Sequence, residues 1–303
     1  MKHLLKILDL TPADIKKILD VGEQMKFDLK HGLDHSFLKG KTLAMVFSKA
    51  STRTRVSFET GMNQLGGFPI VISAEGSQIN RGEPVRDTAR VLSRYCDGIM
   101  IRTFEQAEVE ELAEWATVPV INGLTDFAHP CQILADLMTM RERLGRLAGK
   151  KVAWIGDGNN MANSMIVGAL KCGMSVACAS PKGYEPHADI LKFAKPYGDK
   201  FRLTTDPKEA AAGADVVCTD VWASMGQESE KLAREKAFEG FQVNTELMEL
   251  ANKGAMVQHC LPAHRGEEIT DEVFENHAFE IFEEAENRLH VQKAVMALLM
   301  ASE

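Results

Sequence analysis

The sequence lacks several features that would place it in a specialised class of protein. Its six cysteines include no Cys-x-x-Cys pair, so a structural zinc site has little support. No run of 18 apolar residues occurs, so no transmembrane helix is expected. Positive charge is not in excess, because 35 Lys and Arg stand against 43 Asp and Glu, for a formal net charge of −8. This balance argues against a general nucleic-acid or anionic-membrane role, and any anion site must be a local cluster of cations.

Targeting signals and repeats are also missing. The first ten residues, MKHLLKILDL, carry Lys6 and Asp9 inside their apolar stretch and make a poor signal peptide. Scattered single cysteines are typical of a reducing compartment, so a cytoplasmic location is expected. We find no internal repeat and no low-complexity tract.

Strand-like and helical patterns alternate along the 303 residues, a length sufficient for two domains. The strand-like runs are 42–47, 69–73, 98–101, 118–121, 152–156, 175–178, 215–219 and 255–258. Helical patterns between most of them predict an α/β fold of mostly parallel sheets flanked by helices. The segment LGRLAGKKVAWIG restarts with a strand, which predicts one domain over 1–145 and a second over 146–286. A last helical pattern, 287–303, could pack on either.

A dense group of hydroxyl and cationic side chains follows the apolar run 43–47. Residues 51–55 read Ser-Thr-Arg-Thr-Arg, at the expected turn from strand to helix. A helix N-terminus offers free N–H groups and a partial positive charge, so Arg53, Arg55 and the hydroxyls would make a phosphate-binding cradle. A capped helix with solvated arginines is the alternative. Five consecutive donor residues after a buried strand favour the phosphate interpretation.

Two further candidates lie near strand ends or helix starts. Arg102 directly follows a strand, and ligands of open α/β sheets bind beyond the carboxyl ends of strands. His129 precedes Pro130, which biases its backbone away from helix, and with Gln132 it lies at the start of a helical face. Taken singly, the arginine is also consistent with a solvated side chain and the histidine with a cap or core residue.

The segment VAWIGDGNNMANS has the first two glycines of a dinucleotide fingerprint, Gly156 and Gly158, but Met161 stands where the third is required. No suitable acidic residue clearly closes the next strand. A turn that offers Asn159, Asn160 and backbone donors to a carboxylate fits better.

Two segments after later strands complete the candidates. Asp220 precedes a small-residue loop with Gly226, which can fold over a substrate or be a plain surface loop. His259 and Cys260 follow the last strand. A Cys–His protease pair is conceivable there, but adjacent residues of an extended segment point in opposite directions.

Together these segments resemble the ornithine carbamoyltransferase family within the aspartate/ornithine carbamoyltransferase superfamily, from about residue 1 to 300. The motifs that carry the resemblance are Ser51–Arg55, Gly76–Gln78, Asp87–Tyr95, Arg102–Thr103, His129–Gln132, Asp220–Gly226 and His259–Pro262. The loop Ser224-Met225-Gly226 and His259-Cys260-Leu261-Pro262 are specific to the ornithine branch. Ser48 departs from the glutamate of many relatives, but it precedes the cradle and puts little in doubt.

The resemblance implies transfer of a carbamoyl group from carbamoyl phosphate to L-ornithine, which gives L-citrulline and phosphate. It implies an N-terminal carbamoyl-phosphate domain followed by an ornithine domain. The last helix is expected to pack back on the N-terminal domain. Carried over, the catalytic residues are Arg102, His129, Thr54 and Cys260. Those for carbamoyl phosphate are Ser51, Thr52, Arg53, Thr54, Gln78, Arg102, His129, Gln132, Cys260, Leu261 and Arg288. Those for ornithine are Asn160, Asp220, Ser224 and Met225.

The resemblance further implies a homotrimer in which Gln78 reaches the phosphate of a neighbouring subunit, a place in arginine biosynthesis, and neither metal, cofactor nor covalent intermediate. Three alternatives remain open: a small-molecule sensor of the same fold, a carbamoyltransferase for putrescine, or one for an N-acylated ornithine. The aspartate branch would require cations for a second carboxylate, and the Ser-Met-Gly loop supplies none.

Overall fold

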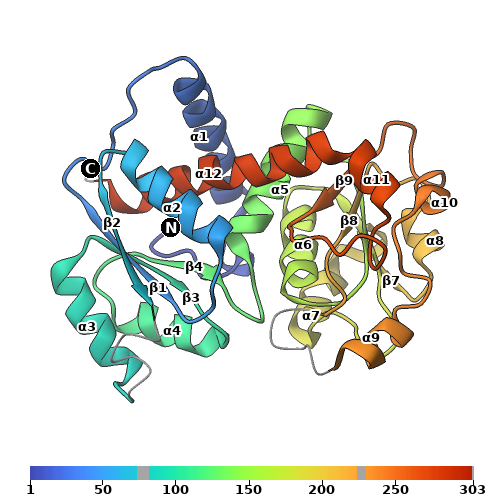
Figure 1. The fold of residues 1–303 in the computed structure, drawn as a ribbon, viewed down its shortest axis with the longest axis horizontal. Coiled ribbons are helices and arrows are strands. Elements are labelled where there is room, and N and C mark those ends of the chain that lie inside the picture. The colour runs from blue at the N-terminus through green and yellow to red at the C-terminus, as the bar shows by residue number, and fades with distance from the viewer. Residues whose placement is uncertain (74–81, 224–229, 302–303) are drawn as a thin grey trace. The chain divides into compact units, whose positions relative to one another are not determined.

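The computed structural model describes residues 1–73, 82–223 and 230–301. The chain divides into two compact units, here called unit 1 (Met1–Met138 and Glu286–Glu303) and unit 2 (Thr139–Ala285) (Figure 1). Gln78, Ser224 and Met225, all expected in the substrate sites, lie outside the described residues. Each unit is therefore considered by itself.

Unit 1 is built on a parallel sheet whose strand order is β2-β1-β3-β4. The strands are β1 Thr42–Phe47, β2 Phe68–Ser73, β3 Gly98–Arg102 and β4 Val120–Leu124. Central β3 is buried along its whole length, as is β1 apart from Thr42. Their apolar sequences, LAMVF and GIMI, match strands that are covered on both faces.

Helices cover both faces of this sheet. They are α1 Pro12–Lys30, α2 Thr52–Gln64, α3 Val85–Tyr95 and α4 Gln106–Trp115, with the 3-10 turn η1 Ile7–Asp9 before them. In Figure 1, α3 and α4 lie on one side of the sheet and α2 lies on the other. Thr11 caps α1 reciprocally with Asp14, and Pro12 occupies the first turn, as the sequence indicates.

Two longer helices, α5 Pro130–Leu144 and α12 Ala278–Met300, contain the points at which the chain divides. The C-terminal part of α12 packs on unit 1, where the side chain of Met300 lies directly against Gly98 of β3: a Cβ on that glycine would come within 2.8 Å of the methionine sulfur. The expected return of the last helix to the N-terminal part of the chain is confirmed.

Unit 2 contains a second parallel sheet, of order β7-β6-β5-β8-β9. The strands are β5 Lys151–Ile155, β6 Ser175–Ala179, β7 Phe201–Thr204, β8 Val216–Thr219 and β9 Met256–His259. The sequence did not predict β7, an edge strand of four residues none of which is buried. Without a buried side it has no apolar pattern to detect.

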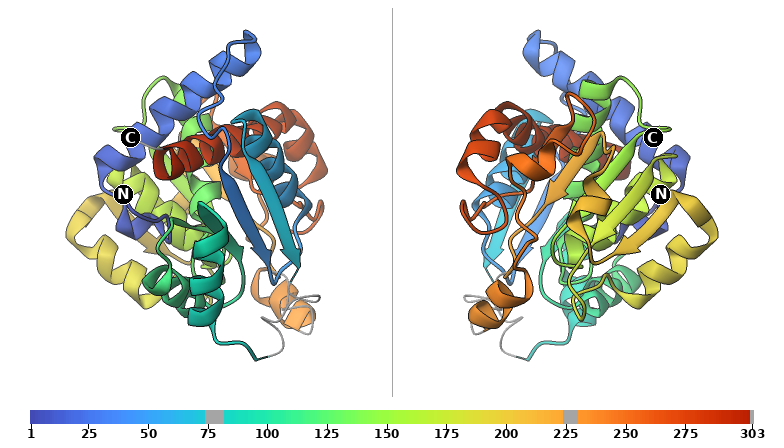
Figure 2. Two further views of the ribbon diagram at one scale, coloured as in Figure 1. Left: turned by 90° about the vertical axis from the view of Figure 1, so that its left-hand side faces the viewer. Right: turned by 90° about the vertical axis from the view of Figure 1, so that its right-hand side faces the viewer.

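The helices of unit 2 are short, apart from α6 Asn160–Lys171. The others are α7 Ala188–Ala194, η4 Lys195–Lys200, α8 Pro207–Ala211, α9 Lys231–Ala237, α10 Thr245–Met248 and α11 Asp271–Asn276 (Figure 2). Ala153 and Ile155 of β5 pack in a core with Phe238, Phe274 and other buried apolar residues. The fold class is as predicted: two parallel α/β sheets flanked by helices.

The strand order gives each sheet a place where its winding reverses. In unit 1 the chain passes from β1 to β2 on one side and then returns to β3 on the other, so the reversal lies between β1 and β3. In unit 2 it lies between β5 and β8. Ligands of open α/β sheets bind at such switch points, outside the carboxyl ends of the strands.

Within the described residues, none of the helices has both the length and the apolar character needed to cross a membrane.

Candidate functional site

The switch point of unit 1 carries the hydroxyl and cationic residues predicted from the sequence. Phe47, the last residue of β1, pairs with Arg102, the last residue of β3. Ser51 caps α2, because its hydroxyl accepts the N–H of Thr54 at 3.2 Å. We call the following set the cationic site: Ser51, Thr52, Arg53, Thr54, Arg102, His129, Gln132 and Arg288.

Arg288 of α12 connects two of these elements. Its Nη1 donates to Gln132 Oε1 of α5 at 2.7 Å, and its Nη2 donates to Thr54 Oγ1 of α2 at 3.2 Å. Gln132 Nε2 in turn donates to Asp136 Oδ1 at 2.9 Å. Arg288, Gln132 and Thr54 are at most 4% exposed, so their bonds form in surroundings that strengthen charge–dipole interactions.

The charges of the cationic site act on His129. Burial, and after it the positive charges of Arg288, Arg102 and Arg53, lower the pKa of His129 well below its ordinary value. The imidazole is therefore neutral at physiological pH, and it can donate one N–H without adding a fourth charge. His129 and the three arginines come from four separate segments of the sequence, and folding brings them close enough for the arginine charges to act on the imidazole.

Two residues of the Ser48–Glu59 segment have partners that the sequence did not indicate. Lys49 is 7% exposed, forms an ion pair with Asp126, and lies 4.3 Å from the ring centroid of Phe104. It thus joins three loops at the carboxyl edge of the sheet. Arg55, by contrast, is exposed and lies 3.3 Å from Glu59 on the same helix, so it is a surface ion pair.

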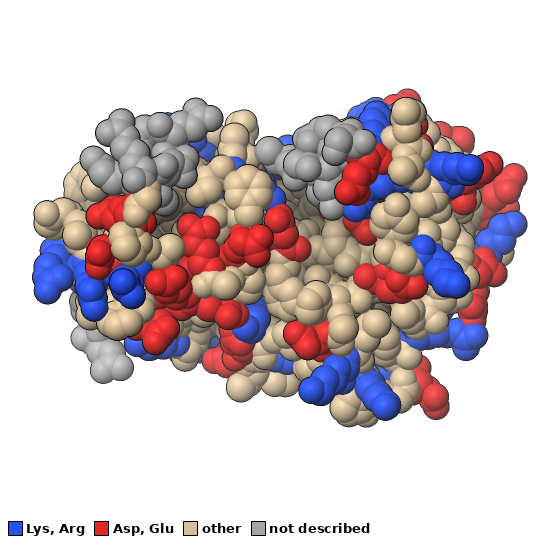
Figure 3. All heavy atoms as spheres, turned by 90° about the horizontal axis from the view of Figure 1, so that it is seen from below, with Lys and Arg blue, Asp and Glu red and all other residues tan. Residues whose placement is uncertain are grey.

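The positive charge of the cationic site is local. Arg102 and Arg288 are 7% and 4% exposed, respectively. The face of the molecule drawn in Figure 3 shows acidic and basic side chains interspersed on each unit. An anion would therefore be bound by buried arginines rather than by a generally positive surface.

The switch point of unit 2 carries the polar residues predicted there. Asn159 caps α6 by accepting the N–H groups of Met161 and Ala162, and its Nδ2 donates to Asp220 Oδ2 at 2.8 Å. Asn160 is the first residue of α6, and Asp220 comes directly after β8. We call Asn159, Asn160, Asp220, Cys260 and Leu261 the acidic site.

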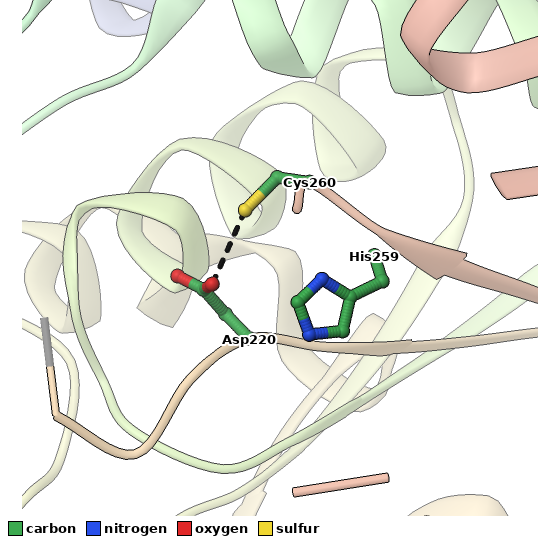
Figure 4. A group of neighbouring side chains, drawn as sticks. All are labelled: Asp220, His259 and Cys260. Carbon is green, nitrogen blue, oxygen red and sulfur yellow. Dashed lines mark hydrogen bonds between the residues drawn. The ribbon is translucent and has the colours of Figure 1, made fainter. Parts of the chain in front are cut away.

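Asp220 is the centre of this group (Figure 4). Its Oδ1 accepts the N–H of Val221 at 2.8 Å and the thiol of Cys260 at 3.2 Å. Asp220 is 6% exposed, and both oxygens of its carboxylate accept hydrogen bonds. It is suited to bind a cationic group.

His259 lies beside Cys260 but has other partners. Its Nε2 lies 3.0 Å from Glu268 Oε1, and its Nδ1 accepts the N–H of Leu261 at 2.9 Å. Cys260 donates to Asp220 instead, so the protease-like interpretation of the pair has no support. Leu261 has a positive φ of 60° and a cis peptide bond to Pro262.

Asp220, His259 and Cys260 each offer an atom that could ligate a metal, all within 4.8 Å of one another. Both ring nitrogens of His259 are already hydrogen-bonded, and the Cys260 thiol carries its proton towards Asp220. A metal would have to displace these partners, so the donor set fits a hydrogen-bonded substrate site better.

Gly158, the second glycine of the supposed dinucleotide fingerprint, has a packing role. A Cβ on Gly158 would lie 2.2 Å from the carbonyl carbon of Glu185 and from the nitrogen of Pro186. Glycine is therefore required here by close approach of the backbone of the next loop.

Asp157 and Arg234 are neighbours of the acidic site that the sequence reasoning missed. Arg234 Nη1 donates to Asp157 Oδ2 and to the carbonyl oxygen of Trp222, both at 2.9 Å. Burial raises the pKa of Asp157 to about 6, against the opposing effect of Arg234. No local pattern could pair two residues 77 positions apart.

The chain matches two family models along almost its whole length. Residues 2–142 match the carbamoyl-P binding domain of aspartate/ornithine carbamoyltransferase, and residues 148–299 match the Asp/Orn binding domain of the same family.

Named relatives and solved structures agree with these models. The chain is 57% identical to the ornithine carbamoyltransferase of Carboxydothermus hydrogenoformans, over 99% of this chain and 97% of that one. It is 56% identical to that of Pelobacter propionicus, over 100% and 99%. The structure of ornithine carbamoyltransferase from Pyrococcus furiosus superposes with a TM-score of 0.95 at 50% identity, over 100% of this chain and 98% of that one.

Proposed function

The chain belongs to the aspartate/ornithine carbamoyltransferase family, and from this membership we propose that it is an ornithine carbamoyltransferase. It transfers the carbamoyl group of carbamoyl phosphate to the side-chain amine of L-ornithine, giving L-citrulline and phosphate. The observation that carries the proposal is the gathering of Arg53, Arg102 and Arg288 around a neutral His129 in unit 1.

Unit 1, with the C-terminal part of α12, binds carbamoyl phosphate in this proposal. The phosphate lies at the start of α2, where the backbone N–H groups, Ser51, Thr52 and Arg53 surround it. Arg288 completes the anion site. Gln132, whose oxygen accepts from Arg288, orients the carbamoyl amide.

The reaction forms a C–N bond and breaks the C–O bond to phosphate. As the amine attacks, the carbonyl oxygen gains negative charge, and Arg102, His129 and Thr54 donate hydrogen bonds to it. Removal of one such donor typically costs about 3–4 kcal/mol of transition-state stabilisation. The leaving phosphate accepts the proton that the amine loses.

Unit 2 binds ornithine in this proposal. Asn160 holds its carboxylate and Asp220 its α-ammonium, together with Ser224 and Met225, which lie outside the described residues. Cys260 lies near the reacting amine, and the Leu261 carbonyl accepts from the carbamoyl amide. The buried carboxylate of Asp220 supports this assignment, because its donors among the described residues are the amide of Asn159, the N–H of Val221 and the thiol of Cys260, none of which is a cation.

The assembly and setting are parts of the same proposal. The enzyme is a homotrimer in which Gln78 of one subunit completes the phosphate site of the next. It serves arginine biosynthesis in the cytoplasm. Six free cysteines are consistent with a reducing compartment.

Steady-state kinetics with a panel of acceptors tests the function. Carbamoyl phosphate with ornithine should give citrulline far faster than product forms with putrescine, N-acetylornithine or aspartate. Putrescine has no carboxylate for Asn160, and an acylated ornithine has no α-ammonium for Asp220. If putrescine is turned over as fast as ornithine or faster, putrescine rather than ornithine is the acceptor. If no amine is turned over, a sensor of the same fold is favoured.

A further inference from the structure

Arg288 is oriented by a buried amide that the motifs do not include. Gln292 follows it by one turn on α12, and Gln292 Oε1 accepts from Arg288 Nε at 2.9 Å. The other two nitrogens of the guanidinium donate to Gln132 and Thr54. Because a guanidinium is planar, bonds from all three nitrogens fix both its position and its plane.

The same amide also contacts α2. Gln292 Nε2 donates to Ser57 Oγ at 2.7 Å, and Ser57 Oγ donates to the carbonyl oxygen of Arg53 at 2.6 Å. Arg53 lies in the first turn of α2, where Ser51 caps the helix. A chain of hydrogen bonds therefore runs from Arg288 through Gln292 and Ser57 to the first turn of α2.

Burial restricts what Gln292 can do. Its side chain is fully buried, and both atoms of its amide are engaged within unit 1. Because the side chain is shielded from solvent, it acts through these protein partners rather than by direct contact with a substrate. Each amide atom faces the complementary partner, so the orientation of the amide is determined as well.

We propose that Gln292 is a positioning residue for carbamoyl phosphate. It fixes the positions of Arg288 and of the first turn of α2 relative to each other, so that both can contact the anion. This inference rests on the proposed function, since it assigns the anion of the cationic site to carbamoyl phosphate. Gln292 acts through Arg288 and Ser57 and touches no reacting atom.

The test compares Gln292→Met with a matched variant on the same helix pair. Methionine has nearly the length of glutamine but removes both hydrogen bonds, so Arg288 loses its third anchor. The Michaelis constant for carbamoyl phosphate should rise by about tenfold to a hundredfold, as for loss of a hydrogen bond to a charged group. The turnover number and the Michaelis constant for ornithine should change by less than about threefold.

Gln64→Met is the matched control. Gln64 Oε1 accepts from Lys293 Nζ at 2.9 Å, so it also joins α2 to α12, but it lies at the other end of α2. Gln64→Met should leave the Michaelis constant for carbamoyl phosphate unchanged. If both variants raise it equally, the effect is a general loosening of two helices and the proposal is overturned.

Ser57→Ala separates the two limbs of the chain of hydrogen bonds. It keeps the bond from Gln292 to Arg288 and removes the connection to α2, so an intermediate rise is expected. If Gln292→Met does not fold, Ser57→Ala with Gln64→Met still decides the matter, because equal Michaelis constants for these two variants count against positioning.

Binding of carbamoyl phosphate and of inorganic phosphate, measured by calorimetry, distinguishes this inference from the proposed function. Wild-type protein that binds both anions more tightly than Gln292→Met, yet makes no citrulline, would overturn the function and keep the positioning role. If wild-type protein makes citrulline, and Gln292→Met has the same affinity and Michaelis constant for carbamoyl phosphate as the wild type, the function is kept and the positioning role is overturned.

Discussion

Arg102 places a buried, permanent charge at the carboxyl edge of the sheet of unit 1. Its side chain is 7% exposed, and its charge is one cause of the lowered pKa of His129. Taking such a charge out of water is costly unless it is paired or hydrogen-bonded. In the proposed reaction, this charge stabilises the oxyanion that forms during carbamoyl transfer.

We expect Arg102→Ala to lower the turnover number by about a hundredfold or more, because the lost interaction forms in the transition state. Steady-state kinetics at saturating carbamoyl phosphate measures this. Arg55→Ala is the control, since Arg55 is exposed and forms an ion pair with Glu59 on its own helix. An unchanged turnover number with weaker carbamoyl-phosphate binding would assign Arg102 to the ground state instead.

Single residues were predictable when their neighbours in sequence gave the signal. Ser51 to Thr54 form an unbroken run of donors after a buried strand, and helix-terminus physics gives such a run its meaning. Gln292 and the Lys49–Asp126 pair were not predictable. Gln292 and Ser57 are 235 positions apart, and only folding brings their polar atoms together.

At the scale of elements, α12 is attached to α2 by a buried lysine. Lys293 Nζ donates to Gln64 Oε1 at 2.9 Å and lies 3.1 Å from His35 Nε2. Burial lowers the pKa of Lys293 from 10.5 to about 8, although the charge of Asp28 acts in the opposite direction. The folded protein thus binds this proton less tightly than the unfolded chain.

This difference predicts a pH dependence of stability. The unfolded chain is protonated at Lys293 up to about pH 10.5, so stability is lost as the pH falls towards 8 and regained as it rises to 10.5. The wild-type free energy of unfolding should increase relative to Lys293→Met between about pH 7.5 and about pH 9.5. Urea unfolding of both proteins measures this, and parallel pH profiles would contradict it.

The turn between β5 and α6 requires a glycine at position 158. An added methyl group would overlap the backbone of Glu185 and Pro186, so either that loop or the start of α6 must move. Gly158→Ala should lower the unfolding temperature by several degrees and raise the Michaelis constant for ornithine through displaced Asn159 and Asn160.

Gly22→Ala in α1 is the matched control for this substitution. Its added Cβ would meet the flexible end of Met138, at 3.3 Å, and alanine favours a helix interior. Little change in unfolding temperature and none in the Michaelis constant is expected. Thermal melts and ornithine kinetics compare the two variants, and equal effects would show that Gly158 has no special role.

At the scale of the whole molecule, strand order determines where chemistry can occur. Alternating strands and helices predicted parallel sheets, and the polar residues after strands marked one edge of each. The strand orders within the two sheets, β2-β1-β3-β4 and β7-β6-β5-β8-β9, could not be predicted from the sequence. These orders make β1 a neighbour of β3, and β5 of β8, and so bring residues from distant segments to the two switch points.

The proposed trimer makes the largest-scale prediction. If Gln78 completes the site of a neighbouring subunit, Arg53→Ala and Gln78→Ala chains, each nearly inactive alone, should complement each other in mixed trimers. Every mixed trimer then contains one site with both residues intact, so an equal mixture reassembled at random should recover about a quarter of wild-type activity.

The control is a mixture of Arg53→Ala with Arg102→Ala. Both arginines act on His129 of the same chain, so a mixed trimer of these variants has no intact site and should recover nothing. Citrulline formation is measured after each mixture is dissociated, reassembled and shown by native mass spectrometry to contain hybrids. Absence of recovery in confirmed Arg53→Ala and Gln78→Ala hybrids would mean that every site is built from one chain, and Gln78 would lose its proposed role at the phosphate.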